Sequence, residues 1–198
     1  GFYVAIGCQG GRLPGIPGQE LSGVRTAIDF LHVANTGALP VSGKVVVVGG
    51  GNVAIDAARV AKRSGASEVT MLSLETEDIM PASPLERAEA REDGVTILPG
   101  WGPKEVKGTE KVEGIVFKKC ISVFDESHRF APKYDEEQTL SLDADLVIFA
   151  IGQTVELKNL LEGTKVEFIR GVYPVADKLT YQTAEEDIFV GGDCFTGP

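Results

Sequence analysis

The sequence has few of the residues that build metal or redox centres. Its three cysteines, Cys8, Cys120 and Cys194, lie far apart, and none belongs to a C-x-x-C pair. We therefore expect neither a zinc site nor a local dithiol. The two histidines, His32 and His128, are isolated in the sequence. Each is interpreted as a surface or half-buried residue rather than as a metal ligand.

Positive charge and long apolar runs are also scarce. The chain has 19 Lys and Arg residues against 29 Asp and Glu residues, which gives a formal net charge of −10. Without a basic stripe, a nucleic-acid or anionic-membrane partner is not expected. No apolar run approaches the ~18 residues that indicate a membrane-spanning helix, and no signal peptide is visible. We therefore expect a cytoplasmic protein.

Hydrophobic residues are plentiful, at 43% of the 198 residues, so the chain can bury a substantial core. Both ends of the chain lie close to segments with the pattern of a strand. The sequence begins with the apolar run Phe2–Ile6, and it stops soon after another apolar run at residues 187–190. Neither end has the character of a natural terminus, so we expect a fragment of a longer protein.

The most informative stretch is a valine run followed by three glycines. Residues 44–48 predict a strand buried on both faces, and the residues after the glycines have apolar spacing typical of a helix. Gly49-x-Gly51-x-x-Ala54 between them is the dinucleotide-binding pattern, in which glycines permit a tight turn and a close pyrophosphate. The helix N-terminus would offer N–H groups to the phosphates. The alternative is a glycine-rich turn that binds no ligand. The predicted cofactor-binding residues are Gly49, Gly50, Gly51, Asn52 and Val53.

An acidic residue stands at the end of the next predicted strand, at residues 68–74. Glu75 lies where an acid would accept a hydrogen bond from the ribose 2′-hydroxyl of the adenosine half. An NADP site would instead need arginine there, to pair with the 2′-phosphate. Residues 73–78 contain three acids and no base, which favours NAD(H) over NADP(H). The alternative for Glu75 is a solvated loop acid.

The remaining pattern predicts an α/β fold, a Rossmann-like NAD(P)-binding domain with a central parallel sheet. Ser83 begins a helix with a capping box, and Gly37 caps an earlier helix. Trp101 is expected in a loop and is interpreted as a core-packing residue. Residues 112–142 predict an antiparallel meander inserted in the parallel sheet, with a charged turn at 125–138. Further predicted elements are helices at 26–34 and 83–92 and strands at 95–98 and 145–153.

Two apolar segments with the same ending suggest two equivalent crossings at a domain junction. These are Ala5-Ile6-Gly7 and Ala150-Ile151-Gly152. A third apolar segment, residues 187–190, runs into Gly192-Asp193, where a carboxylate could accept a hydrogen bond from a ligand hydroxyl. The alternative for Asp193 is an ordinary turn aspartate.

These pieces, in this order, resemble the two-dinucleotide flavoproteins of the pyridine nucleotide-disulfide oxidoreductase superfamily, and among them the small (beta) subunit of glutamate synthase. Residues 49–56 resemble that subunit's nicotinamide-cofactor loop, and Asp78–Ala82 its Met-Pro stretch after the second strand. Leu179–Thr183 followed by Val190–Asp193 is similar to the FAD-binding Gly-Asp motif. The resemblance implies that Asp193, with Gly192, holds the ribityl chain of FAD, and that Gly152 lies in a crossing beside the cofactors.

The resemblance implies an FAD-dependent oxidoreductase that passes hydride from NAD(P)H to FAD and electrons onward through iron–sulfur centres of another domain or a partner subunit. Residues 1–40 would be a partial FAD-binding domain with a connecting helix, 41–153 the NAD(P)-binding domain, and 154–198 the return to the FAD domain. The cofactors carry the chemistry, so no catalytic side chain is assigned.

Two departures from the family pattern matter. NADPH-dependent members place paired arginines where this chain has Leu74-Glu75, which favours NADH. The FAD fingerprint and the cysteine-rich iron–sulfur segments are missing, so we expect weak flavin affinity or none in the isolated chain.

Two other functions remain open. One is a non-catalytic Rossmann module that senses NAD(H), and the other is an NAD-dependent dehydrogenase of a small substrate. The dehydrogenase would need a catalytic acid or base in a separate domain, and none is found. The missing dithiol argues against a disulfide exchanger resembling thioredoxin reductase.

Overall fold

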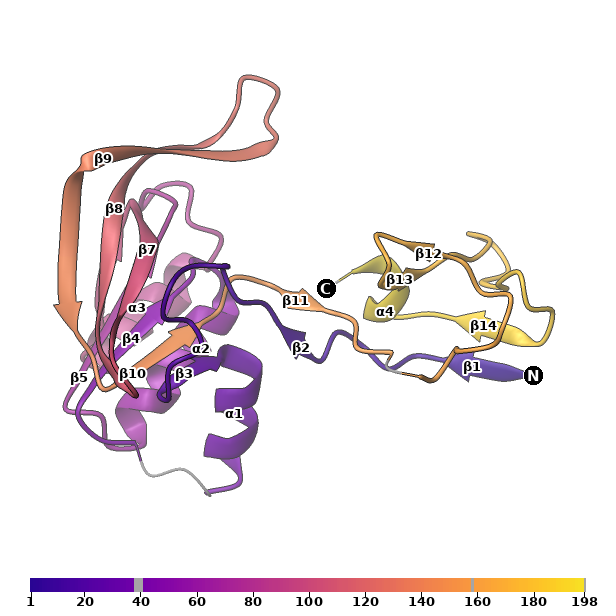
Figure 1. The fold of residues 1–198 in the computed structure, drawn as a ribbon, viewed down its shortest axis with the longest axis horizontal. Coiled ribbons are helices and arrows are strands. Elements are labelled where there is room, and N and C mark those ends of the chain that lie inside the picture. Colours follow the sequence, from indigo (N-terminus) through magenta and orange to yellow (C-terminus); the bar gives the residue numbers. More distant parts are fainter. Residues whose placement is uncertain (38–40, 158, 198) are drawn as a thin grey trace. The chain divides into compact units, whose positions relative to one another are not determined.

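The computed structural model describes residues 1–37, 41–157 and 159–197, which form two compact units (Figure 1). The larger unit is Arg12–Ile151, and the smaller unit combines Gly1–Gly11 with Gly152–Pro198. This division differs from the segments expected from the sequence on the N-terminal side. The described residues from Arg12 to Gly37 belong with the larger unit, because a strand and a helix from this segment pack on its sheet.

The larger unit is built on a five-stranded parallel sheet in the order β3-β10-β4-β5-β6. Four of its strands were predicted; three lie within one residue of the expected ends, whereas the last, expected at 145–153, already ends at Phe149. Strand β3 was not predicted, because three residues are too few to show an alternating pattern. The five strands are β3 (Val24–Thr26), β4 (Lys44–Val48), β5 (Glu68–Ser73), β6 (Thr96–Pro99) and β10 (Leu146–Phe149).

Three helices pack on one face of this sheet: α1 (Ala27–Asn35), α2 (Asn52–Arg63) and α3 (Pro84–Glu92). The predicted helix ends are largely confirmed, with Gly37 (φ 71°) following α1. Ser83 Oγ accepts a hydrogen bond from the Glu86 N–H at 3.2 Å, as in a capping box. The reciprocal half of the box is not formed, because the Ser83 N–H donates to Asn52 Oδ1 instead, at 3.0 Å.

The predicted meander exists, but it differs from the expectation in three respects. It is a separate antiparallel sheet, β7-β8-β9, that covers the other face of the parallel sheet rather than extending it (Figure 1). Trp101 begins a strand instead of lying in a loop, and residues 130–138 are strand instead of turn. The strands are β7 (Trp101–Gly108), β8 (Val112–Phe124) and β9 (Phe130–Asp143). The first part of β9, residues 130–138, was missed because most of these residues are polar or exposed and show no apolar alternation.

Strand β4 shows how the valine run serves both layers. Val45 and Val47 are buried against the helices, whereas Val46 and Val48 are buried against the antiparallel sheet. This follows from the period of two along a strand. The continuous apolar run is therefore explained by cover on both faces, as predicted.

The smaller unit contains short elements only. Strand β1 (Phe2–Val4) pairs in parallel with β14 (Ile188–Val190). Strand β2 (Gly10–Gly11) pairs in antiparallel fashion with β11 (Gln153–Thr154); these strands follow the two segments predicted as crossings, and the crossings themselves stay a prediction. The remaining elements are β12 (Phe168–Ile169), β13 (Tyr173–Pro174) and α4 (Asp193–Thr196).

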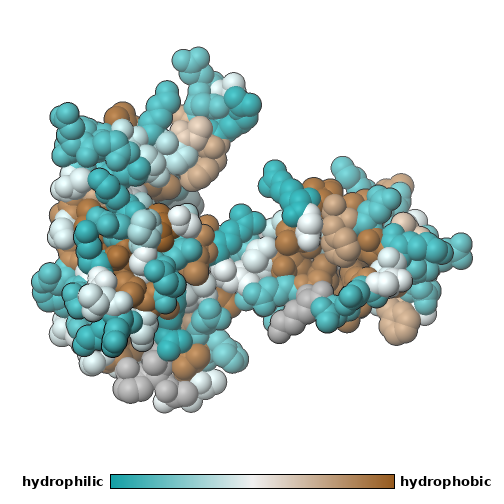
Figure 2. All heavy atoms as spheres, in the orientation of Figure 1, coloured by the Kyte–Doolittle hydropathy of each residue, from teal (hydrophilic) through white to brown (hydrophobic). Residues whose placement is uncertain are grey.

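Large apolar side chains lie on the surface of the smaller unit, as the brown areas over this unit in Figure 2 illustrate. Phe2 is 68% exposed and Leu179 is 89% exposed. Phe168 and Ile169, which form β12, are exposed as well. In the larger unit, by contrast, the two core clusters are extensive and continuous. No helix in the described residues has both the length and the apolar character needed to cross a membrane.

An ion-pair cluster joins α2 to the end of α3 and should make stability depend on pH. Arg59 Nε and Arg63 Nη2 contact Asp93 Oδ2 at 2.7 and 2.8 Å. The hydrogen bond from Arg59 and the nearby Arg63 charge hold the pKa of Asp93 below its ordinary value. A depressed folded-state pKa stabilises the fold above the unfolded-state value, about 4, and this stabilisation is lost as the pH falls through the lower folded-state pKa.

We therefore expect Asp93→Asn to be less stable than the wild type at pH 7, with a gap that narrows below about pH 4. Denaturant unfolding at several pH values measures this. Asp56→Asn, an exposed change on the same helix α2, is the control and should track the wild type. If the unfolding free energies of Asp93→Asn and the wild type differ by the same amount at every pH, Asp93 does not have a lowered pKa in the folded chain.

Candidate functional site

The three glycines connect β4 to α2, and the structure assigns the two outer ones different roles. A side chain at Gly49 would meet the Ala150 carbonyl oxygen, since a Cβ there would lie 2.4 Å from it, and the φ of Gly49 is 152°. A Cβ at Gly51 would meet nothing within 4 Å. Gly49 is therefore needed by the fold itself, whereas Gly51 leaves open space beside the first turn of α2. The N–H groups of that turn have no partner within the helix and suit an anion.

The middle glycine makes room for the predicted acid. A Cβ at Gly50 would lie 2.4 Å from Glu75 Oε2, so the carboxylate of Glu75 lies directly over the glycine loop. The backbone of Glu75 is held in place, because its carbonyl oxygen accepts hydrogen bonds from the Gly100 N–H (2.9 Å) and Ser73 Oγ (3.0 Å). Within the described part of the chain, no hydrogen bond or ion pair engages its carboxylate. Glu75 is thus positioned and has its acceptor oxygens available.

A pair of hydrogen bonds ties the segment after β5 to the glycine loop. The Ala82 N–H donates to the Gly50 carbonyl at 2.9 Å, and the Ser83 N–H donates to Asn52 Oδ1 at 3.0 Å. Asn52 was predicted only as a residue near the phosphates. The hydrogen bond that Asn52 accepts from Ser83 was not predicted from the sequence, because the two residues are 31 positions apart and no periodic pattern links them.

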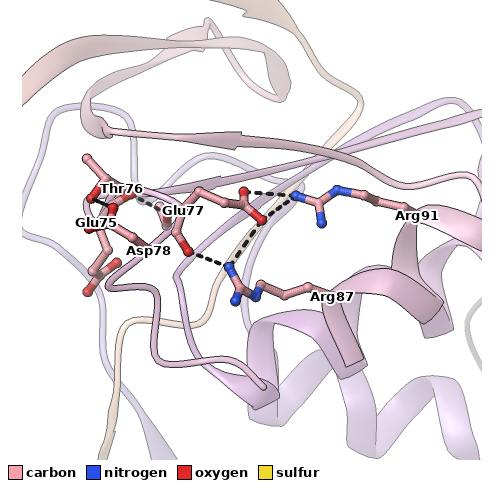
Figure 3. A network of polar contacts seen from close by, with 7 residues as sticks. Glu75, Thr76, Glu77, Asp78, Arg87 and Arg91 are labelled. Atoms are coloured by element: carbon pink, nitrogen blue, oxygen red, sulfur yellow. Dashed lines mark hydrogen bonds and ion pairs between the residues drawn. The ribbon is translucent and has the colours of Figure 1, made fainter. Parts of the chain in front are cut away.

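The acidic stretch after β5 is less negative in its surroundings than its sequence indicates (Figure 3). The Glu77 carboxylate points to α3, where Arg91 Nη2 lies 2.8 Å and Arg87 Nη1 3.1 Å from its Oε1. Asp78 Oδ1 accepts a hydrogen bond from Thr76 Oγ1 at 2.5 Å, which lowers the pKa of Asp78. Residues 73–78 contain three acids and no base, but in the folded chain α3 brings two arginines to Glu77.

A cavity of about 530 Å³ lies over the glycine loop, entirely within the larger unit. Gly49, Gly50, Gly51 and Glu75 line it, and Glu75 is the only acid among its lining residues. The cavity is at the carboxyl ends of β4, β5 and β10. Open parallel sheets typically bind ligands outside the carboxyl ends of their strands, at the point where the strand order reverses. Its size falls within the usual range of small-molecule sites, ~300–1,000 Å³.

The structure brings together six of the nine predicted site residues. Five of them form the loop and the first turn of α2, at residues 49–53, and Glu75 lies above them. The other three, Gly152, Gly192 and Asp193, lie in the smaller unit. Gly192 (φ 67°) precedes α4, and the Asp193 side chain is exposed, with no described residue bonded to its carboxylate.

Residues 3–198 match the family model described as pyridine nucleotide-disulphide oxidoreductase. Over 199 residues the chain is 36% identical to the glutamate synthase [NADPH] small chain of Halomonas elongata, covering 92% of this chain and 42% of that protein. It is 32% identical over 196 residues to the NAD-dependent dihydropyrimidine dehydrogenase subunit PreT of Escherichia coli K12, covering 98% and 41%. The chain thus spans less than half the length of these relatives.

Among solved structures, FprA of Mycobacterium tuberculosis in complex with NADPH is similar, with a TM-score of 0.78 and 21% sequence identity. The likeness covers 99% of this chain and 58% of that one. At this level of identity it shows the fold alone, and it agrees with the α/β architecture expected from the sequence.

Proposed function

The chain belongs to the pyridine nucleotide-disulphide oxidoreductase family, and from this membership we propose that its larger unit binds NAD(H) over the glycine loop. The pyrophosphate would lie on residues 49–53 and the adenosine ribose at Glu75. One observation carries the proposal. Open space at Gly51, beside the first turn of α2, adjoins a carboxylate that lies over Gly50 and has no described partner.

The preference for NADH over NADPH rests on Glu75. The 2′-phosphate of NADPH brings a charge of about −1.5 to −2, whereas the 2′-hydroxyl of NADH can donate a hydrogen bond to a carboxylate. Arg87 and Arg91, which lie beside this segment, form ion pairs with Glu77. The names of the relatives include both NADPH-linked and NAD-dependent proteins, so the choice is assigned here from the residues of this chain.

In the whole protein, the proposed activity is transfer of hydride from NAD(P)H to FAD, with electrons passing to iron–sulfur centres of another domain or a partner subunit, as in the glutamate synthase beta subunit. Flavin chemistry needs no side chain of this unit beyond those that bind and orient cofactors. We propose the cytoplasm as its location.

The residues of this chain fit FAD only in part. Gly152, Gly192 and Asp193 are proposed to face the flavin, and the unengaged carboxylate of Asp193 could accept a ribityl hydroxyl. The sequence has no second G-x-G-x-x-G pattern for the flavin pyrophosphate. The exposed apolar side chains of the smaller unit support its assignment as part of a larger flavin domain.

Calorimetric titration of the purified chain with NADH, NADPH and FAD tests the proposal. NADH should bind at least ~10-fold more tightly than NADPH, which is ~1.4 kcal/mol, and FAD should bind weakly or not at all. Tighter binding of NADPH would overturn the role of Glu75. No binding of either nicotinamide cofactor would overturn the proposed site.

A further inference from the structure

The cavity over the glycine loop has a second wall that the dinucleotide pattern does not explain. Beyond Glu75, it is lined by residues of the antiparallel sheet. These are Trp101 and Pro103 of β7, Lys118 of β8, and Phe130, Pro132 and Tyr134 of β9. Figure 1 shows β8 and β9 continuing as a long hairpin past the parallel sheet. The wall is mostly aromatic and apolar, whereas the loop side is glycine.

The rings of this wall are held in place by their neighbours. A Cβ at Gly102 would lie 2.4 Å from Tyr134 Cε1 and 2.8 Å from Leu74 Cδ2, so the glycine makes room for the tyrosine ring. Lys118 Nζ lies 4.2 Å from the centre of that ring and is fixed by Glu136 Oε1 at 2.8 Å. Both contacts restrain the Tyr134 ring, and Lys118, which lies over that ring, lines the cavity as well.

The wall is directly connected to the ribose-binding acid. The Gly100 N–H donates to the Glu75 carbonyl at 2.9 Å, and Trp101 follows Gly100 in the chain. The side chain of Leu74, which precedes Glu75, lies beside Gly102, as the Tyr134 ring does. Glu75 and these rings line one cavity, so a base attached to a ribose at Glu75 enters the space that the rings border.

We propose that the aromatic wall of Trp101, Phe130 and Tyr134 binds the purine base of the dinucleotide, so that the β8–β9 hairpin is a specificity-determining element for adenosine. The proposal rests on the proposed function, because it extends the same site. Aromatic side chains suit a base, since every base offers a flat π-face. The burial that raises the pKa of Tyr134 also keeps its hydroxyl neutral and able to donate a hydrogen bond.

The chain's single tryptophan makes this wall directly observable. Purified chain is titrated with ADP-ribose, which has the adenine but no nicotinamide, while Trp101 fluorescence is recorded and calorimetry measures the affinity. We expect a saturable change in Trp101 emission with ADP-ribose and none with ribose 5-phosphate, which has no base.

Two variants test the rings. Tyr134→Leu and Phe130→Ala should each weaken ADP-ribose binding by about 10-fold, within the range measured for stacking of a base on an aromatic side chain. Phe130 is 65% exposed, so its replacement leaves the fold intact even if Tyr134→Leu does not. Ile121→Ala is the matched control, because Ile121 is 68% exposed on the same hairpin and does not line the cavity.

The outcomes separate this inference from the function on which it rests. If calorimetry detects no binding of NADH or ADP-ribose, the proposed function fails. If ADP-ribose binds but Trp101 emission is unchanged and both ring variants bind like Ile121→Ala, the dinucleotide site stands and the base-binding wall is refuted.

Discussion

Replacement of Gly51 by valine should abolish NADH binding while the chain remains folded. A Cβ at this position would meet no protein atom within 4 Å, and Gly51 has an extended conformation (φ −95°, ψ 176°) that valine also adopts. The new side chain would fill the space where the pyrophosphate approaches the first turn of α2. We expect affinity for NADH to fall by ~100-fold or more, equivalent to ~2.8 kcal/mol.

Calorimetry measures the affinity, and thermal unfolding measures the fold. The melting temperature should fall by only a few degrees, since valine is a poorer N-cap than glycine by about 1 kcal/mol. Asp56→Val is the matched control, because it adds the same side chain to an exposed position of α2. A folded Gly51→Val variant with wild-type affinity would show that the loop does not hold the pyrophosphate.

Replacement of Glu75 by arginine should turn the cofactor preference toward NADPH. The carboxylate lies over Gly50 and lines the cavity, so a guanidinium at this position could pair with the 2′-phosphate by two charge-assisted hydrogen bonds. Removal of a like charge and addition of such bonds should change the ratio of NADPH to NADH affinity by ~100-fold, or ~2.8 kcal/mol. Titration of each variant with both cofactors measures this ratio.

Two further variants make the result specific. Glu75→Gln removes the negative charge without supplying a positive one, so it should shift the ratio by only about 10-fold. Glu68→Arg makes the same charge change at the other end of β5, where the residue is exposed and outside the cavity lining, and should leave the ratio unchanged. An unchanged ratio in Glu75→Arg, or an equal shift in Glu68→Arg, would remove Glu75 from cofactor selection.

The parts of this protein that the sequence alone determined are those with local signals. The run of valines, the three glycines and the apolar spacing after them identified the strand, the loop and the helix that follows it. Glu75 was predicted as the ribose contact because it follows a strand at a typical distance from the loop, and the structure places its carboxylate over Gly50. Such patterns survive in a sequence because burial and backbone geometry constrain each residue through its nearest neighbours in the chain.

The tertiary structure alone decided which distant residues meet. It placed the antiparallel sheet as a layer over the parallel sheet, made residues 130–138 a strand, and so brought Tyr134 to the cavity. It also brought Arg87 and Arg91 to Glu77, which leaves Glu75 as the acid that faces the cavity. No periodic pattern encodes these contacts, because each joins side chains whose separation in sequence is set by the packing of whole elements. Which acid of residues 73–78 is paired and which lines the cavity is therefore decided only in the folded protein.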